Sequence, residues 1–487
     1  MSISITSSTA GTLQYSGLTS DTNWVDVVDE LMKVERFTIN KLSEWKQEWA
    51  DKITSLQGLD SRLLILETIA GNMSKKNEFY SRISSSSNED VLEVTNTSAA
   101  TPGAHSVTMQ CLAQVEVQTH SGFEDENTSF VTTADGTFSY TYGDVTRTVD
   151  VSANSTLSDL RGLINNDTDN PGVTAVIIND GSGSETAFHL QLIGNDSGAD
   201  YTIEDITHDL DNFANGGGSG FSETQSAQNA MLKVDGYPTG EGDYIERASN
   251  TIGDLISGVT ISLTGTGTST ISITDDTDTI KEKIEEFVET VNTVLDYIRE
   301  QTAYDKAGNG ENNGVMIGNY GFQIVQRRIN SILSTPVPGL TDGTDTYTRL
   351  SQIGIKTDPD QNGKWVIDNS ALQSALNNDL DSVCNLFTRN EITDVSGIAE
   401  LVRDETDKLT KDYSDANPGI VSVLVNNYND IISNIDSKIE REERRLAMVE
   451  NRLNTKFTQL EVLLGELQGQ SDYLTAVLEN LPQIGKD

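Results

Sequence analysis

Cysteine and histidine are scarce in this chain of 487 residues. The two cysteines, Cys111 and Cys384, supply neither a disulfide framework nor the paired spacing of a zinc site. The four histidines form no His-Glu-x-x-His arrangement. We therefore predict no metal site and no cofactor. These histidines are His105, His120, His189 and His208.

Long apolar runs and basic residues are also lacking. No stretch of 18 residues is predominantly apolar, so we expect no transmembrane helix and no membrane insertion. The chain has 33 Lys and Arg against 75 Asp and Glu, a formal net charge of −42. Phosphate backbones are repelled by this charge, which excludes nucleic acid as a partner. The first 32 residues contain no Lys or Arg, so a conventional secretory signal peptide is not expected.

Motifs that mark common enzyme classes are absent from the sequence. There is no Gly-x-Ser-x-Gly elbow, no phosphate loop ending in Gly-Lys-Ser or Gly-Lys-Thr, and no Gly-x-Gly-x-x-Gly. Acidic pairs are too numerous for any one of them to indicate acid–base catalysis. We predict no catalytic residues, and the chain is not expected to be an enzyme.

One acidic segment resembles the first half of a calcium-binding loop. Asp358 to Gly363 places Asp, Asp, Asn and Gly at loop positions 1, 3, 5 and 6. Position 12 is Asn369, where a bidentate Glu is needed, and Pro359 favours a turn. A hairpin turn is the better interpretation. The acidic run from Asp275 to Asp278 is predicted to begin the helix that follows it.

Both ends of the chain show heptad patterns, which are typical of long helices with a packing seam. Lys52, Glu442 and Lys456 fall on these seams and interrupt them. In the first segment the packing residues are Leu42, Trp45, Trp49, Leu56, Leu59, Leu63 and Leu66. In the last segment they are Ile432, Ile435, Ile439, Leu446, Val449, Leu453, Leu460, Leu463, Leu467 and Leu474. A third helical pattern runs from Ile280 to Ile298, and we expect these helices to bundle together.

The middle of the chain alternates apolar and polar residues, which indicates half-buried strands. This alternation appears from Val107 to Val117, from Phe138 to Tyr142 and from Val173 to Ile177. Residues 121–224 contain 18 acidic residues and only two arginines. Such a segment is expected to project into solvent, away from neighbours of the same charge.

This order of elements predicts an α+β multidomain protein. The N- and C-terminal helices pair into a coiled-coil leg and a helical bundle, and antiparallel β head domains are inserted between them. We expect residues 1–39 and 451–487 in the leg, and residues 40–75 and 276–450 in the bundle. The first β head contains 76–120 and 225–275, and the second, acidic head contains 121–224.

The N-terminal run from Gly17 to Arg36 resembles the opening of the flagellar hook-associated protein 2 family. Within this run, the pairs Leu31-Met32 and Glu35-Arg36 are the most specific matches to the family. Thr38 stands where the family usually has Pro. Further similar segments follow in the family's order: Leu232 to Gly236, Arg247 to Leu263, Ile353 to Ile355 with Asp368 and Leu386-Phe387, and Arg452 to Leu474. Thr148 to Leu192 is similar to a small repeat found in flagellins.

This resemblance implies a structural cap at the distal tip of the bacterial flagellum. The cap would be a homo-oligomeric ring, a pentamer in the family, that promotes folding and insertion of exported flagellin. The other partners implied are the hook-associated junction proteins and an export chaperone. The resemblance also implies an extracellular protein that leaves the cell through the flagellar type III channel without a cleaved signal peptide.

Several apolar residues of the predicted leg are candidate contacts to flagellin, a neighbouring subunit or the export chaperone. They are Trp24, Val28, Leu31, Met32, Phe457, Leu464 and Tyr473. Trp is favoured at interfaces, yet Trp45 and Trp49 lie on the heptad seam, where packing within the bundle is the simpler interpretation. The alternative function is a flagellar tip adhesin that binds host or surface glycans through the acidic head. An enzyme acting on extracellular polymers is a weaker alternative.

Overall fold

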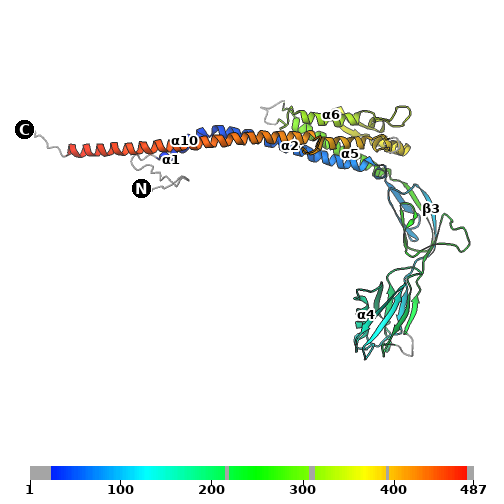
Figure 1. Ribbon diagram of the computed structural model, residues 1–487. Coiled ribbons are helices and arrows are strands. Elements are labelled where there is room, and N and C mark those ends of the chain that lie inside the picture. Colours follow the sequence, from blue (N-terminus) through cyan, green and yellow to red (C-terminus); the bar gives the residue numbers. More distant parts are fainter. Residues whose placement is uncertain (1–22, 214–218, 306–312, 391–393, 480–487) are drawn as a thin grey trace, which may run out of the picture. The chain divides into compact units, whose positions relative to one another are not determined.

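Two long helices from opposite ends of the chain pack side by side, α2 (Phe37–Ser74) and α10 (Ile420–Glu479) (Figure 1). The computed structural model describes residues 23–213, 219–305, 313–390 and 394–479. At 60 residues, α10 is about 90 Å long. A shorter helix, α1 (Trp24–Glu35), precedes α2 and is separated from it by Arg36. The predicted terminal helices are therefore present.

The chain divides into two compact units. The bundle unit contains residues 1–75 and 283–487, and the head unit contains residues 76–282. In the bundle unit, α2 also packs along α9 (Ile398–Thr410), and α9 contacts α6 (Tyr320–Ser334). The remaining elements of this unit are α7 (Asn369–Asn378), α8 (Leu380–Phe387), η1 (Leu350–Ile353), η2 (Pro359–Gln361), β16 (Ile355–Asp358) and β17 (Lys364–Ile367).

Helix α5 (Thr277–Thr302) fills the third helical pattern of the sequence. Its apolar face, including Ile284, Phe287 and Leu295, is buried. Asp276 caps its start, since the carboxylate accepts the N–H of Thr279 at 3.0 Å. The acidic run thus begins the helix as predicted, except that Asp275 forms an ion pair with Arg82 instead.

The head unit contains two antiparallel β domains, each with its own apolar core. The first domain has a five-stranded sheet whose order is β1 (Arg82–Ser86), β15 (Gly267–Asp275), β3 (Gly103–Cys111), β11 (Ala230–Val234) and β12 (Ile245–Arg247). Its second sheet is β13 (Thr251–Ile256), β14 (Val259–Leu263) and β2 (Leu92–Asn96). A short helix, α3 (Lys76–Phe79), starts the unit.

The second head domain is also built from two sheets. One has the order β10 (Phe221–Gln225), β4 (Val117–His120), β8 (Phe188–Gly194) and β7 (Val173–Asn179), and the other β6 (Val145–Val151), β5 (Gly136–Tyr142) and β9 (Ile203–His208). Helix α4 (Leu157–Asn165) contacts β7 and β6. The buried core residues include Phe138, Tyr140, Leu190 and Leu192.

Strand pairing corrects one expected domain boundary. The alternation from Val107 to Val117 predicted one strand, but the chain forms β3 and then β4, which pairs with β8 of the second domain. The second head domain therefore begins near residue 117 rather than at 121. The chain leaves this domain through β10, which pairs antiparallel with β4.

The Asp358 segment forms a hairpin turn between β16 and β17. The Asp358 carboxylate accepts the N–H of Asp360 at 2.9 Å, and Asn362 and Gly363 take positive φ angles. Within the described ranges, no group of three His, Cys, Asp or Glu side chains is placed to hold a metal ion. Among the same residues, no helix combines the length and apolarity needed to cross a bilayer.

Candidate functional site

Helix α1 docks on the middle of α10 through an apolar cluster. Val28 and Met32, one turn apart on α1, are buried with Leu446 of α10. The Trp24 ring stacks on Phe457 with ring centres 4.9 Å apart. The Trp24 indole N–H donates to the carboxylate of Glu461 at 2.6 Å. The structure thus brings together Trp24, Val28, Met32 and Phe457, four of the candidate contacts, within one chain.

Two of the polar residues on the predicted seams, Lys52 and Glu442, have an aromatic partner and a partner of opposite charge, respectively. Lys52 Nζ lies 4.2 Å from the centre of the Trp49 ring, a cation–π contact. Glu442 pairs with Arg445 at 2.7 Å, and Arg445 also reaches Glu35 of α1 at 3.2 Å. Exposed pairs of this kind stabilise a fold by only about 0–1 kcal/mol. The Arg445–Glu35 pair therefore joins α10 to α1 only weakly.

The predicted seam residues and the candidate leg contacts divide into three classes of exposure. The buried ones are Val28, Met32, Leu56, Leu59, Leu63, Leu66, Ile435 and Leu446. The half-buried ones are Trp24, Leu42, Trp49, Ile432, Ile439, Val449, Leu453, Phe457 and Leu464. The exposed ones are Leu31, Trp45, Leu460, Leu463, Leu467, Tyr473 and Leu474. Burial is therefore concentrated in the bundle and at the α1 contact.

Beyond Phe457, α10 presents apolar side chains to solvent. We call Leu460, Leu463, Leu467 and Leu474 the exposed α10 stripe; Leu467 is 51% exposed and Leu474 59%. From residue 457 to 479 the helix has four acidic residues and no Lys or Arg. An apolar stripe on an acidic helix is unusual for a surface without a partner.

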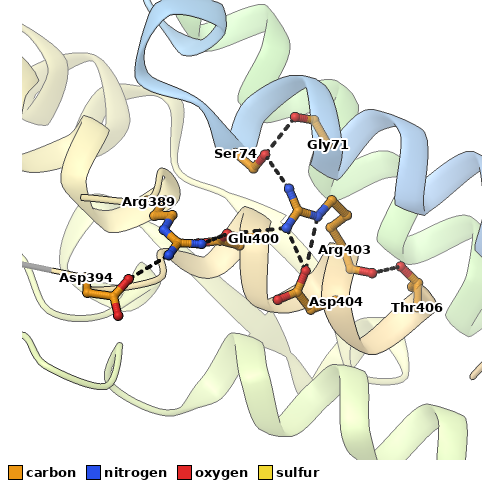
Figure 2. Close-up of polar contacts among 8 residues, drawn as sticks. All are labelled: Gly71, Ser74, Arg389, Asp394, Glu400, Arg403, Asp404 and Thr406. Atoms are coloured by element: carbon orange, nitrogen blue, oxygen red, sulfur yellow. Dashed lines mark hydrogen bonds and ion pairs between the residues drawn. The ribbon is translucent and has the colours of Figure 1, made fainter. Parts of the chain in front are cut away.

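A buried carboxylate joins three segments of the bundle unit (Figure 2). Glu400 of α9 is 3% exposed, and its Oε1 accepts from Arg389 at 3.2 Å and from Arg403 at 3.3 Å. Arg403 also donates to Ser74 Oγ at 3.2 Å, and the Arg389 backbone N–H donates to the Ser74 carbonyl at 2.9 Å. We call Ser74, Arg389, Glu400 and Arg403 the α2 clamp.

The α2 clamp fixes the last residue of α2. Its two guanidinium groups extend outward to Asp394 and Asp404, at 2.6 and 2.7 Å. The Glu400 Oε2 atom is buried without a hydrogen-bond partner, so its charge depends on both arginines. Sequence patterns missed this cluster, because heptad spacing carries no information about polar residues more than three hundred positions apart.

The second head domain carries a helix with a complete capping box. Thr156 Oγ1 accepts the N–H of Asp159, and Asp159 Oδ2 accepts the N–H of Thr156 at 2.9 Å. Hydrogen bonds donated to the Asp159 carboxylate by the backbone N–H and the hydroxyl of Thr156 lower the pKa of Asp159. The adjacent strand carries Arg147, which forms an ion pair with Asp167. Contacts between residues close in sequence thus fix the start of α4 and its position beside β6.

Comparison with known families matches most of the chain. The model of the flagellar hook-associated protein 2 N-terminus matches residues 20–116, and that of its C-terminus matches residues 227–469. The flagellin hook IN motif matches residues 135–189, which confirms the flagellin-like repeat in the acidic head. The N-terminal and C-terminal matches lie on either side of the second head domain.

Relatives align over nearly the whole length. Flagellar hook-associated protein 2 of Escherichia coli K12 is 28% identical over 95% of this chain and 97% of its own. The A-type protein of Pseudomonas aeruginosa is 28% identical over 98% and 99%. The crystal structure of the flagellar cap protein D1-D2-D3 domains from Escherichia coli is 27% identical. It covers 77% of this chain and 99% of that one, with a TM-score of 0.60.

These matches confirm the predicted α+β multidomain architecture, with β domains inserted between terminal helices. The family is a structural one and not a family of enzymes. The chain belongs to the flagellar hook-associated protein 2 family.

Proposed function

We propose that this chain caps the distal tip of a bacterial flagellar filament. In this proposal its copies form a homo-oligomeric ring that promotes folding and insertion of exported flagellin. The family assignment supports the cap role, and the exposed α10 stripe is the observation that carries the assembly role. We further propose that the chain reaches the outside of the cell through the flagellar channel.

The exposed α10 stripe supports contact with a protein other than a second copy of the same segment. Burial of these leucines against a partner would favour binding, since each fully buried Leu contributes about 1.5–3 kcal/mol of hydrophobic free energy. The four acidic residues between 457 and 479 would repel the same segment of a neighbouring subunit. Flagellin at the filament tip, or the export chaperone before secretion, is therefore the partner we propose for the stripe.

The four-part organisation is proposed with one change. The leg contains 1–39 and 451–487, and the bundle contains 40–75 and 276–450. The heads are divided near residue 117 because β4 belongs to the second domain. We propose a ring of five subunits that sits above the hook-associated junction proteins and the flagellin filament. The pentamer follows from the family resemblance.

The test is complementation of a strain that lacks its own copy of this protein. The double variant Leu467→Glu, Leu474→Glu places two charges on the exposed α10 stripe. We expect short or missing filaments and flagellin monomer in the medium, measured by electron microscopy and by quantifying secreted flagellin. Detection of the variant itself in the medium separates failed capping from failed export.

The matched control is Thr458→Glu, Gly469→Glu, which adds the same charge on the opposite face of α10. Helical geometry places both positions about 180° from the stripe, and a Cβ added at Gly469 meets no heavy atom within 4 Å. This control should support normal filaments. Normal filaments with the stripe variant would overturn the assembly role of the stripe.

A further inference from the structure

A buried histidine lies in the second head domain, at the end of the strand by which the chain enters it. His120 of β4 is 2% exposed. Its ring stacks on Phe123 at 5.0 Å, and the ring centres of Phe213 and Phe221 lie at 4.3 and 5.3 Å. Gly220 at φ +73° allows close approach, since a Cβ there would lie 2.6 Å from His120 Nε2. The imidazole is thus enclosed by aromatic rings and backbone.

Hydrogen bonds fix this imidazole in one neutral form. His120 Nε2 lies 2.6 Å from the carbonyl oxygen of Phe213, which only accepts, so Nε2 carries the proton. The backbone N–H of Gly122 donates to Nδ1 at 3.1 Å, so Nδ1 presents its lone pair. A second proton on Nδ1 would face the Gly122 N–H. Protonation therefore breaks a buried hydrogen bond and places a charge in the core.

Among the residues that the structure describes, no carboxylate is found to offset this charge at the ring. The titratable groups that act on His120 are two other histidines, His189 of β8 and His208 of β9. His189 donates from Nδ1 to the His120 carbonyl at 2.9 Å, and its Nε2 lies 3.4 Å from Asp180. The other groups that surround the His120 ring are uncharged: the turn at residues 122–123, Phe213 and Phe221. Protons on neighbouring histidines would add repulsion.

We propose that His120 makes the second head domain acid-labile, so that mild acid loosens this domain while the bundle unit keeps its fold. All four histidines of the chain lie in the head unit, and the bundle unit contains none. Histidine is the side chain whose ordinary charge change falls between pH 5 and 8. The part of the response to mild acid that depends on histidine is therefore confined to the head unit.

Proton linkage determines in which direction pH changes the stability of the second head domain. Burial lowers the pKa of His120 to about 4, from an ordinary value of 6.5. The opened domain binds the proton more tightly than the folded one, so opening becomes easier as the pH falls from about 6.5 toward 4. Burial raises the pKa of Glu116, which directly precedes β4. Its titration stabilises the fold in acid, so it opposes this opening.

The test is hydrogen exchange, measured by mass spectrometry on the full chain from about pH 7 to about pH 5 and corrected for intrinsic rates. The opening constant of peptides from β4 and β8 should rise about fivefold per pH unit across this range, or about twentyfold in all. All four tryptophans lie in the bundle unit, so their fluorescence should stay constant. A flat opening constant in the head peptides would overturn the proposal.

Two variants assign the effect to His120. His120→Gln keeps a donor toward Phe213 but does not titrate, and His120→Phe keeps the ring stacking. Either variant should remove the rise in opening toward low pH and leave only the opposite, weaker effect of Glu116, whereas the control His105→Gln, at an outer site paired with Asp235, should keep the rise. An unchanged slope in His120→Gln contradicts the proposal. If both variants fail to fold, deuterium exchange at the imidazole C2 of the unmodified chain reports the pKa directly, and a value near 6.5 contradicts it.

Discussion

The indole of Trp24 donates a 2.6 Å hydrogen bond to the carboxylate of Glu461, which lies 437 residues further along the chain. Glu461 is 7% exposed although it lies on an otherwise exposed stretch of α10. A buried carboxylate without its donor costs more than an ordinary lost hydrogen bond. This contact therefore marks the point on α10 where cover by α1 ends and the exposed α10 stripe begins.

Replacing Trp24 with Phe should loosen the start of α1. The variant keeps stacking on Phe457 but leaves the Glu461 carboxylate without the indole donor. We expect a loss of about 1–3 kcal/mol in the local stability of α1. Hydrogen exchange of peptides from residues 24–35 measures it. Trp45→Phe, at an exposed ring beneath Lys438, is the control that should leave these peptides unchanged.

A combined substitution separates the hydrogen bond from the stacking. Trp24→Phe together with Glu461→Gln removes the indole donor and the buried charge at once. The double variant should therefore recover part of the stability lost in Trp24→Phe alone, because no buried charge remains that has lost the indole donor. A double variant less stable than either single variant would contradict this account.

Heptad spacing predicted which face of α10 is apolar, and Leu446 and Ile435 are indeed buried on it. It did not predict where the buried seam ends, because period alone does not say how far a partner helix reaches. The limit is set by Trp24, since the described α1 begins there. Glu461 was missed for the same reason: a single acidic residue on a helix gives no sign that a tryptophan from the other end covers it.

Removing Arg403 should destabilise the bundle unit. In Arg403→Met the buried Glu400 keeps only Arg389, and Ser74 Oγ loses a donor. Breaking a buried ion pair from one side costs up to about 3–5 kcal/mol, and partial exposure of Arg403 should hold the loss to the lower end. Tryptophan fluorescence during urea unfolding measures it, because every tryptophan lies in this unit.

The control for the α2 clamp is Arg444→Met on α10, whose partner Glu440, one helical turn away, has a side chain that is 66% exposed. Pairs at this spacing contribute about 0.3–0.5 kcal/mol, so unfolding should change little. Glu400→Gln provides a second test: it removes the buried charge but keeps an acceptor, and it should cost less than Arg403→Met. Equal losses in all three variants would show that the α2 clamp has no special role.

Thr156→Ala should weaken α4 in the second head domain. The substitution removes the side-chain acceptor for the Asp159 N–H and so breaks the capping box. An N-cap of this kind contributes about 1 kcal/mol, or roughly a fivefold rise in local opening. Hydrogen exchange of peptides from residues 157–165 measures it, and Thr156→Ser should restore protection. An effect of similar size in both variants would assign the loss to the methyl group instead of the cap.

The β heads were predictable as alternating strands but not as two separate sheets per domain. Alternation predicted β5 and β7 closely, because each has one face in the core. The partner of a strand depends on contacts far away in sequence, so β4 looked like a continuation of β3. Glu116 lies between these two strands, and its burial follows from that change of sheet.

Glu116→Gln should stabilise the second head domain at neutral pH. Burial raises the pKa of Glu116, and the hydrogen bonds from Gln118 and from the backbone of Ile203 offset this only in part. With a raised pKa in the folded state, the folded domain is favoured by protonation and loses stability as the pH rises through that pKa. A neutral glutamine avoids this loss. We expect a gain on the order of 1 kcal/mol near pH 7.

The gain in stability from Glu116→Gln should depend on pH. Below the ordinary pKa of glutamate the native carboxyl is protonated in both the folded and the unfolded domain, so the advantage of glutamine should vanish there. Hydrogen exchange of β4 and β8 peptides across this range measures the difference between the two proteins. A gain that is constant with pH would mean that glutamine improves packing, and that the charge of Glu116 is tolerated at no cost. A stability loss at pH 7 would mean that the carboxylate is needed as an acceptor for the Ile203 and Gln118 donors.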